Sequence, residues 1–144
     1  MIIHLSVPGV PVGKGRPRTR VVKLPDGRTL PTHYTPKKTR DYERTIALLA
    51  KAEMRRAGVT RHAIGGLRLQ VVALFKRPAS VSAKKRPMPT VKPDLDNVVK
   101  SVFDGLQQAE VFLDDAQVVE ISASKVYVTG EPGLEIELSY AREG

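Results

Sequence analysis

Four stretches of the chain alternate hydrophobic with polar residues, which is the pattern of β-strands buried on one face. They are residues 3–7, 67–75, 118–128 and 134–140. Residues 129–133, Thr-Gly-Glu-Pro-Gly, form a turn sequence between the last two stretches. We therefore expect those two strands to pair with each other as a hairpin.

Two other stretches space their hydrophobic residues three and four positions apart, as a helix requires. In the first, Thr39 is the expected cap and Gly58 the expected stop. The second helix is expected from about Asn97 to Gln108, with a buried stripe of Val99, Val102, Phe103 and Leu106. Together the elements predict an α+β fold, a small mixed sheet packed with two main helices, in one domain over residues 1–144.

Composition narrows the class of protein. With 144 residues and 41% hydrophobic content, the chain is expected to fold around a core. It contains no cysteine, which excludes disulfides, thiolate zinc sites and cysteine nucleophiles. No apolar run approaches the roughly 20 residues that cross a bilayer, and the first residues lack the features of a signal peptide. We expect a soluble cytoplasmic protein, associated with the nucleoid.

Charge is distributed unevenly along the chain. Residues 1–92 hold 21 Lys and Arg against 4 acids, a net charge of +17, whereas residues 93–144 hold 3 bases against 11 acids, a net charge of −8. A basic region of this size suits a protein that attracts a polyanion, and nucleic acid is the leading candidate. The carboxylates of residues 93–144, which we call the acidic third, are then available for another role.

Two segments rich in proline, glycine and basic residues interrupt the regular elements. In the first, residues 8–36, a Pro25-Asp26-Gly27 turn can close a small hairpin. The second, residues 77–92, is expected to be an exposed, mobile loop. The candidate DNA contacts in these segments are Lys14, Arg16, Arg18, Arg20, Lys84, Lys85 and Arg86.

The acidic third begins with two aspartates separated by one residue, Asp94 and Asp96. Because Pro93 precedes them, we expect both to lie in extended chain just before the second helix, with their carboxylates on one side. Two close carboxylates favour a cation between them, and oxygen ligands select Mg²⁺ or Mn²⁺. Lys100 lies one helical turn after Asp96, where it can stabilise the charge of a phosphate.

A second acidic pair, Asp114 and Asp115, precedes the third strand. Adjacent residues in extended chain point to opposite sides, so only one of the pair is expected to join Asp94 and Asp96. The spacing fits an ordinary structural role equally well. In that interpretation Asp96 is a helix cap, Asp96, Lys100 and Asp104 form a charge ladder on one helix, and Asp114 and Asp115 mark a turn.

The run KPDLDNVVKSVFDGLQQAEVFLDDAQV, residues 92–118, combines the DxD spacing, a lysine four residues after the second aspartate, and an aspartate pair after an aromatic-Leu step. This combination resembles the signature of the RusA-type Holliday junction resolvases, Mg²⁺-dependent endonucleases that cut four-way DNA junctions. The similarity extends more loosely to residues 9–11 and the bases after them, to residues 34–36, and to the helix around Tyr42 and Glu43. It spans most of the chain.

The resemblance implies a function and a set of site residues. It places catalytic carboxylates at Asp94, Asp96 and Asp115, which would bind one or two Mg²⁺ (or Mn²⁺), and a catalytic lysine at Lys100. It favours Asp115 over its neighbour Asp114. It also implies a two-fold homodimer that makes paired nicks in branched DNA during recombination and repair, leaving 5′-phosphate and 3′-hydroxyl ends. The position before the first aspartate, often basic in the family, is Pro93 here.

Two other functions are consistent with the same sequence. A non-enzymatic, basic nucleic-acid-binding module would explain the positive charge, although it would not explain why Asp94, Asp96, Lys100 and Asp115 should converge. A metal-dependent nuclease for other branched DNA or for RNA would keep the site and change the substrate. Cleavage assays on four-way junctions, duplexes, flaps and hybrids separate these possibilities.

Overall fold

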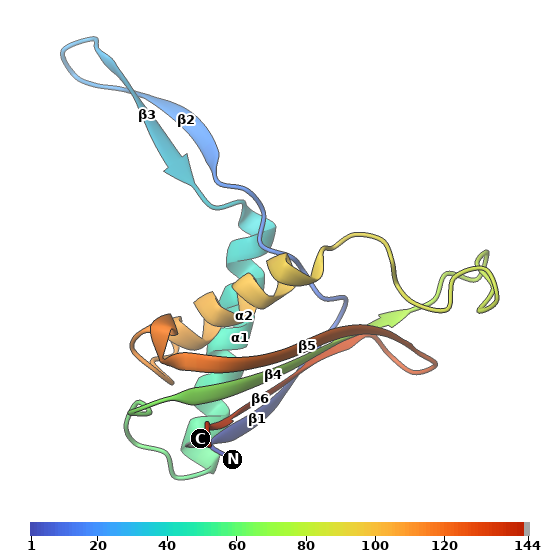
Figure 1. Cartoon of the computed structure of the whole chain (residues 1–144). Helices are drawn as coiled ribbons and strands as arrows, with labels where there is room; N and C mark the ends of the chain where they lie inside the picture. Colours follow the sequence, from blue (N-terminus) through green and yellow to red (C-terminus); the bar gives the residue numbers. More distant parts are fainter. Residues whose placement is uncertain (143–144) are drawn as a thin grey trace.

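A computed structural model of the protein describes residues 1–142 and contains two helices, one short 3-10 turn and two sheets (Figure 1). The elements in chain order are β1 (Ile3–Pro8), β2 (Arg18–Lys23), β3 (Thr29–Tyr34), α1 (Lys37–Arg56), β4 (Leu67–Lys76), α2 (Leu95–Gln108), η1 (Asp115–Gln117), β5 (Val118–Val128) and β6 (Gly133–Tyr140). This confirms the predicted α+β fold with a mixed sheet and two main helices.

The larger sheet has four strands in the order β1-β6-β4-β5. β4 pairs in parallel with β5 and antiparallel with β6, and β1 pairs antiparallel with β6. A parallel pair needs a long crossover connection, and α2 provides it between β4 and β5. The sheet therefore contains a β-α-β unit with two antiparallel strands added on the other side of β4.

The prediction that the last two strands form a hairpin is wrong. β4 lies between β5 and β6, so the turn at residues 129–132 spans two strand spacings rather than one. The physical reason is that β4 is the central strand and the most apolar one, with buried residues at Leu67, Leu69, Val71, Ala73 and Phe75. Such a strand is stabilised most by neighbours on both edges.

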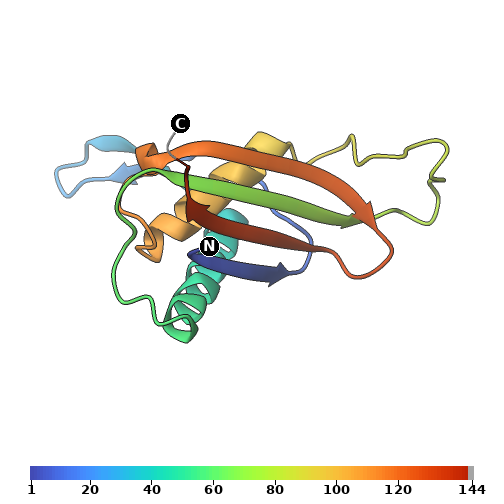
Figure 2. The same ribbon diagram turned by 60° about the horizontal axis from the view of Figure 1, so that its bottom comes forward.

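Both helices lie on one face of the sheet and form the core with it (Figures 1 and 2). Ile46 on α1 and Val98, Val102 and Leu106 on α2 are completely buried against strand residues such as Leu69. The opposite face of the sheet carries polar residues, including His4, Glu135 and Glu137. Glu135 and Glu137, which belong to the acidic third of the sequence, therefore lie on the face of the sheet that points away from the helices.

The two helices approach each other closely at Gly105. A Cβ at this position would lie 2.6 Å from Ile46 Cγ2 and 3.0 Å from the Glu43 carbonyl oxygen, so a side chain here would force the helices apart. The buried stripe of α2 differs from the predicted one: Val98 is buried where Val99 was expected, and Phe103 is only half-buried.

The start of α1 also differs from the prediction. The helix begins at Lys37 after Pro36, so Thr39 lies inside the first turn and is buried rather than capping the helix. The hydroxyl of Thr39 instead accepts a hydrogen bond of 3.0 Å from the Gly15 amide. Gly58, with a φ of +73°, follows the last turn as expected.

Two basic segments extend away from this body. β2 and β3 form the predicted hairpin, with the Leu24 amide donating to the Arg28 carbonyl across its turn, and every strand residue in it is exposed (Figure 1). Residues 77–94 contain no helix or strand, as predicted. Within residues 1–142, no helix is long and apolar enough to cross a bilayer.

Candidate active site

The first turn of α2 carries the first pair of predicted site residues. The helix begins at Leu95, so Asp94 is its N-cap in extended conformation and Asp96 already lies in helical backbone. The prediction that both lie in extended chain is therefore wrong for Asp96. The cause is local, because the Asp94 carbonyl oxygen accepts hydrogen bonds from the Asn97 and Val98 amides, which closes the turn around Asp96.

Asp94 borders a hollow of about 560 Å³, which we call the Asp94 hollow. Its charged lining is Lys14, Arg18, Lys38, Lys92 and Asp94. Lys92 Nζ lies 3.4 Å from Asp94 Oδ2, in an exposed ion pair. A single carboxylate surrounded by four cations suits an anionic ligand such as a phosphate backbone, with the carboxylate at one side of it.

Asp115 borders a second hollow, of about 360 Å³, which we call the Asp115 hollow. Lys14, Lys100, Phe103, Asp104 and Ala116 complete its lining. Lys100 Nζ also lies 3.9 Å from Asp96 Oδ2, with both side chains largely exposed. The structure therefore brings Lys100 near both Asp96 and Asp115, although these two acids lie on different elements, and Lys14 borders both hollows.

The structure separates the roles of the two adjacent aspartates, Asp114 and Asp115. The Asp114 carboxylate accepts a 2.9 Å hydrogen bond from the Ala116 amide and so caps the η1 turn, whereas Asp115 faces the hollow. Gln117 completes this arrangement and was missed by the sequence analysis. Its amide nitrogen donates to the carbonyls of Ala63 and Gly65, at 2.9 and 3.2 Å, which ties the turn to the loop before β4.

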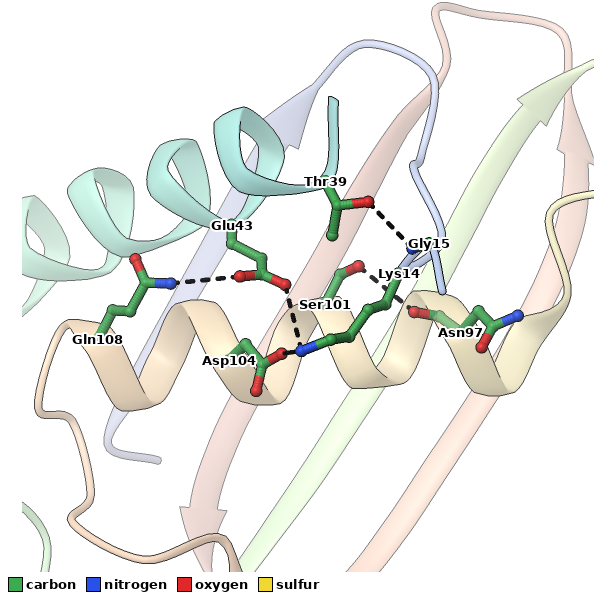
Figure 3. A network of polar contacts seen from close by, with 8 residues as sticks. All are labelled: Lys14, Gly15, Thr39, Glu43, Asn97, Ser101, Asp104 and Gln108. Atoms are coloured by element: carbon green, nitrogen blue, oxygen red, sulfur yellow. Dashed lines mark hydrogen bonds and ion pairs between the residues drawn. The ribbon is translucent and has the colours of Figure 1, made fainter. Parts of the chain in front are cut away.

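Lys14, predicted as a DNA contact, is the centre of a polar network between the two helices (Figure 3). Its ammonium donates to Asp104 on α2 and lies 3.7 Å from Glu43 on α1. Gln108 donates a 3.3 Å hydrogen bond to the other oxygen of Glu43. The Lys14 amide donates to the Asn97 carbonyl at 2.8 Å, so backbone and side chain both fix the N-terminal loop to α2.

The network changes the proton affinity of its members. Burial raises the pKa of the Glu43 carboxyl and the neighbouring Asp104 raises it further, while Lys14 lowers it. The hydrogen bond to Asp104 raises the pKa of Lys14 above its ordinary value of 10.5. Lys14 is therefore a fully charged ammonium that is already neutralised by carboxylates, and it is less available to a phosphate than the exposed cations nearby.

The other predicted DNA contacts are differently placed. Arg16, Arg18 and Arg20 are exposed, and so are Lys84 and Lys85 in the loop before α2. Arg86 is half-buried, and its carbonyl oxygen accepts a 3.3 Å hydrogen bond from the Arg77 guanidinium. Arg77 also lies 4.5 Å from the centre of the Tyr127 ring, which fastens the base of this loop to β5.

The predicted metal ligands suit the ion in kind but are not assembled around a common point. Exposed carboxylates are the ligands that Mg²⁺ takes in proteins, and Asp94, Asp96 and Asp115 are all exposed. Among residues 1–142, however, no three His, Asp or Glu side chains lie close enough together to hold a metal ion. That Asp94, Asp96 and Asp115 bind Mg²⁺ or Mn²⁺ therefore stays a prediction.

Comparison with known proteins adds a family relationship. A family model described as "Endodeoxyribonuclease RusA" matches residues 8–139. The chain is 33% identical to the uncharacterized protein YqaN of Bacillus subtilis (strain 168), in an alignment that covers 93% of both chains. It is also 46% identical, over 46 residues, to the crossover junction endodeoxyribonuclease RusA of Escherichia coli (strain K12) and to that of Enterobacteria phage 82.

These similarities differ in extent. The alignment with YqaN covers nearly all of both proteins, whereas the alignments with the named endodeoxyribonucleases cover 32% of this chain and 38% of those proteins. The family model bridges the difference, because its match includes the basic N-terminal segment, both helices and all the predicted site residues.

Proposed function

Because the chain belongs to the RusA family of endodeoxyribonucleases, we propose that it cuts branched DNA, and specifically that it resolves four-way junctions in recombination and repair. The family match over residues 8–139 carries the proposal, since it includes Asp94, Asp96, Lys100 and Asp115 together. Relatives named crossover junction endodeoxyribonuclease support the choice of a four-way junction as the substrate.

The two hollows support this assignment through their charge. The Asp94 hollow offers exposed cations from three different segments, as a bent or branched phosphate backbone requires. The Asp115 hollow adjoins the Asp94 hollow through Lys14. A DNA strand lying across the start of α2 would therefore pass from the cations of the Asp94 hollow to the acids of the Asp115 hollow. Base-specific contacts are not needed for this mode of binding.

In the proposed site each residue has a separate role. Asp94, Asp96 and Asp115 are the candidate ligands of Mg²⁺ or Mn²⁺, and their exposed side chains can rotate toward a bound ion. Such an ion, when bound, supplies an activated water and neutralises charge on the phosphate. Lys100, 3.9 Å from Asp96 and on the border of the Asp115 hollow, holds a phosphate oxygen and stabilises the charge that develops on it.

A two-fold homodimer is part of the proposal. Resolution of a four-way junction needs two symmetric nicks, and one active site of this size cuts one DNA strand at a time. A C2 dimer presents two identical sites to a substrate that is itself nearly two-fold symmetric. Size measurement by light scattering tests this point independently of cutting.

The test of the proposed function is cleavage of a labelled four-way junction in Mg²⁺, beside a linear duplex, a flap and an RNA–DNA hybrid. We expect the wild-type chain to nick the junction in pairs and chelation by EDTA to stop it. Asp96→Asn should bind the junction as well as the wild type and fail to cut it. Asp41→Asn, which removes an exposed aspartate paired with Lys37 on α1, should cut normally.

Other outcomes select other functions. Cutting of flaps or hybrids in preference to junctions would keep the site and change the substrate. Tight binding without cutting of any substrate would identify a non-enzymatic nucleic-acid-binding module. Equal cutting by the wild type and Asp96→Asn would overturn the assignment of the site.

A further inference from the structure

The β2–β3 hairpin contributes little to the core of the protein. All twelve of its strand residues are exposed, and it projects from the body as an isolated two-stranded ribbon (Figure 1). A hairpin of this kind is only marginally stable by itself. Its exposed residues nevertheless include apolar ones, with Val22 39% and Leu30 51% accessible to solvent.

The two faces of the hairpin differ in chemistry. Residues directly opposite each other in an antiparallel pair share a face, and successive residues alternate between faces. The register therefore places six residues on one face, which we call the arginine face: Arg18, Arg20, Val22, Leu30, Thr32 and Tyr34. The Arg20 guanidinium lies 4.7 Å from the centre of the Tyr34 ring, as this arrangement requires.

Charge and hydrophobicity are separated along the arginine face. Arg18 and Arg20 lie near the body, and the directly paired Val22 and Leu30 lie near the turn. The hairpin from residue 18 to residue 34 holds four basic residues and one acid, a net charge of +3, and its acid, Asp26, is paired with Arg28 at 2.6 Å. A polyanion is the partner that this charge fits.

The root of the hairpin is fixed beside the candidate active site. Arg18 borders the Asp94 hollow, and Lys14 and Gly15 just before it are hydrogen-bonded to α2 and α1 (Figure 3). A Cβ at Gly13 would lie 3.1 Å from the Cβ atoms of Asn97 and Pro93, so the loop passes unusually close to the start of α2 at this glycine. The hairpin is therefore anchored to the start of the helix that carries Asp94 and Asp96.

We propose that the β2–β3 hairpin recognises the branch point of DNA, with Arg18 and Arg20 on phosphates beside the cut and with Val22 and Leu30 against exposed base pairs at the branch. This inference rests on the proposed function and adds a substrate-recognition element to it. A two-stranded ribbon fits the major groove, and apolar side chains can wedge against unstacked bases. A continuous duplex keeps its base pairs stacked, so the apolar pair distinguishes a branch from a duplex.

The test measures binding without cutting, in EDTA, by fluorescence anisotropy on a four-way junction and on a duplex of equal length. The double variant Val22→Thr/Leu30→Thr removes the apolar pair and keeps strand propensity. We expect it to bind the junction about tenfold more weakly and the duplex unchanged. The control Val21→Thr changes an apolar residue on the opposite face, 67% exposed, and should leave both affinities unchanged.

Two further measurements sharpen the test. Arg20→Ala should weaken binding to junction and duplex alike and reduce the slope of log affinity against log salt by about one. A 2-aminopurine base at the branch should brighten when the wild-type chain binds and respond less to the double variant. Circular dichroism and urea unfolding should match between all variants, because the hairpin residues are exposed.

The outcomes separate this inference from the proposed function. If the wild type prefers the junction and the double variant prefers it equally, the role of the hairpin tip is overturned and the proposed nuclease is untouched. If the wild type binds junctions through the hairpin and cuts no DNA, the nuclease is overturned and the hairpin inference holds. A wild-type chain without any preference for junctions would overturn both.

Discussion

Two groups of acidic residues lie around α2, and they differ in their surroundings rather than in their chemistry. Asp94, Asp96 and Asp115 are exposed, and the ion pairs formed by the first two, with Lys92 and Lys100, are 3.4 and 3.9 Å long. At the other end of the helix, Asp104 shares Lys14 with Glu43, which is only 5% exposed. Acids in one segment of the sequence can therefore either stabilise the fold or stay accessible to a ligand, and their burial decides which.

The contributions of these two groups of acids to folding stability follow from their difference in burial. Exposed ion pairs contribute about 0–1 kcal/mol to stability, so Asp94 and Asp96 can exchange their partners for a ligand at little cost. Breaking a buried ion pair costs about 3–5 kcal/mol, because a charge is left without a partner. The Lys14 network therefore holds the N-terminal loop against both helices, and the exposed acids remain free for chemistry.

The largest expected effect comes from two neighbouring aspartates with opposite roles. Asp115→Asn should reduce junction cutting at least about 100-fold with no loss of stability, because it removes a proposed ligand of the catalytic ion. Asp114→Asn makes the same change of charge one residue away and should cut normally, since an asparagine oxygen can accept the Ala116 hydrogen bond.

Rates in Mg²⁺ and urea unfolding of both variants check this prediction. If Asp114→Asn lost activity as severely as Asp115→Asn, the assignment of Asp115 as the functional member of the pair would be wrong.

The next effect is on stability and compares two lysines. Lys14→Met should lower the free energy of unfolding by about 2 kcal/mol, because Glu43 and Asp104 would then face each other without a cation. We expect a loss smaller than the roughly 3–5 kcal/mol of a fully buried ion pair, because the Lys14 side chain is 30% exposed. Lys100→Met removes an exposed pair and should change stability by less than about 0.5 kcal/mol while stopping the cutting.

Urea unfolding at neutral pH measures both lysine variants. Equal stability of Lys14→Met and the wild type would show that the network is not a structural element. A large loss of stability in Lys100→Met would contradict the contrast between buried and exposed partners.

The smallest effect is a dependence of stability on pH. Burial raises the pKa of Glu43 above its ordinary value of 4.5, so between that value and the raised one the folded protein binds more protons than the unfolded chain. Stability contributed by this group must therefore fall as pH rises through that window. Glu43→Gln should remove this part of the slope. Unfolding free energies of both proteins at several pH values from 4 to 8 test it, and identical slopes would contradict it.

Local patterns in the sequence were sufficient to predict most individual elements. The strands of the larger sheet and the two helices follow from alternation and helical spacing, because these patterns record which side of an element is buried. The hairpin closed at residues 25–27 follows from its turn residues. The pairing of β5 with β4 could not be predicted in the same way. It depends on which strand edges meet after α2 packs on the sheet, and no local pattern contains that information.

The candidate site likewise combines residues that the local sequence indicated with roles that depend on the fold. Its residue types and their spacing pointed to the start of α2 and the turn before β5, where the structure places Asp94, Asp96, Lys100 and Asp115. The choice between Asp114 and Asp115 needed either the family resemblance or the observed cap. Gln117 caps η1 together with Asp114 at the spacing of a capping box, which is a local sequence signal. Its tie to the loop before β4 has no such signal, since it depends on carbonyl groups more than 50 residues away in the chain.

Local patterns alone therefore identify the elements, the excess of basic charge before the acidic segment, and the carboxylates that could bind a metal. Packing is needed to place Lys14 between Glu43 and Asp104, and to place the exposed Arg18 on the border of the same hollow as Asp94. A residue's type sets what it can bind, but burial and the partners brought to it by packing set what it does bind, and both are properties of the folded chain.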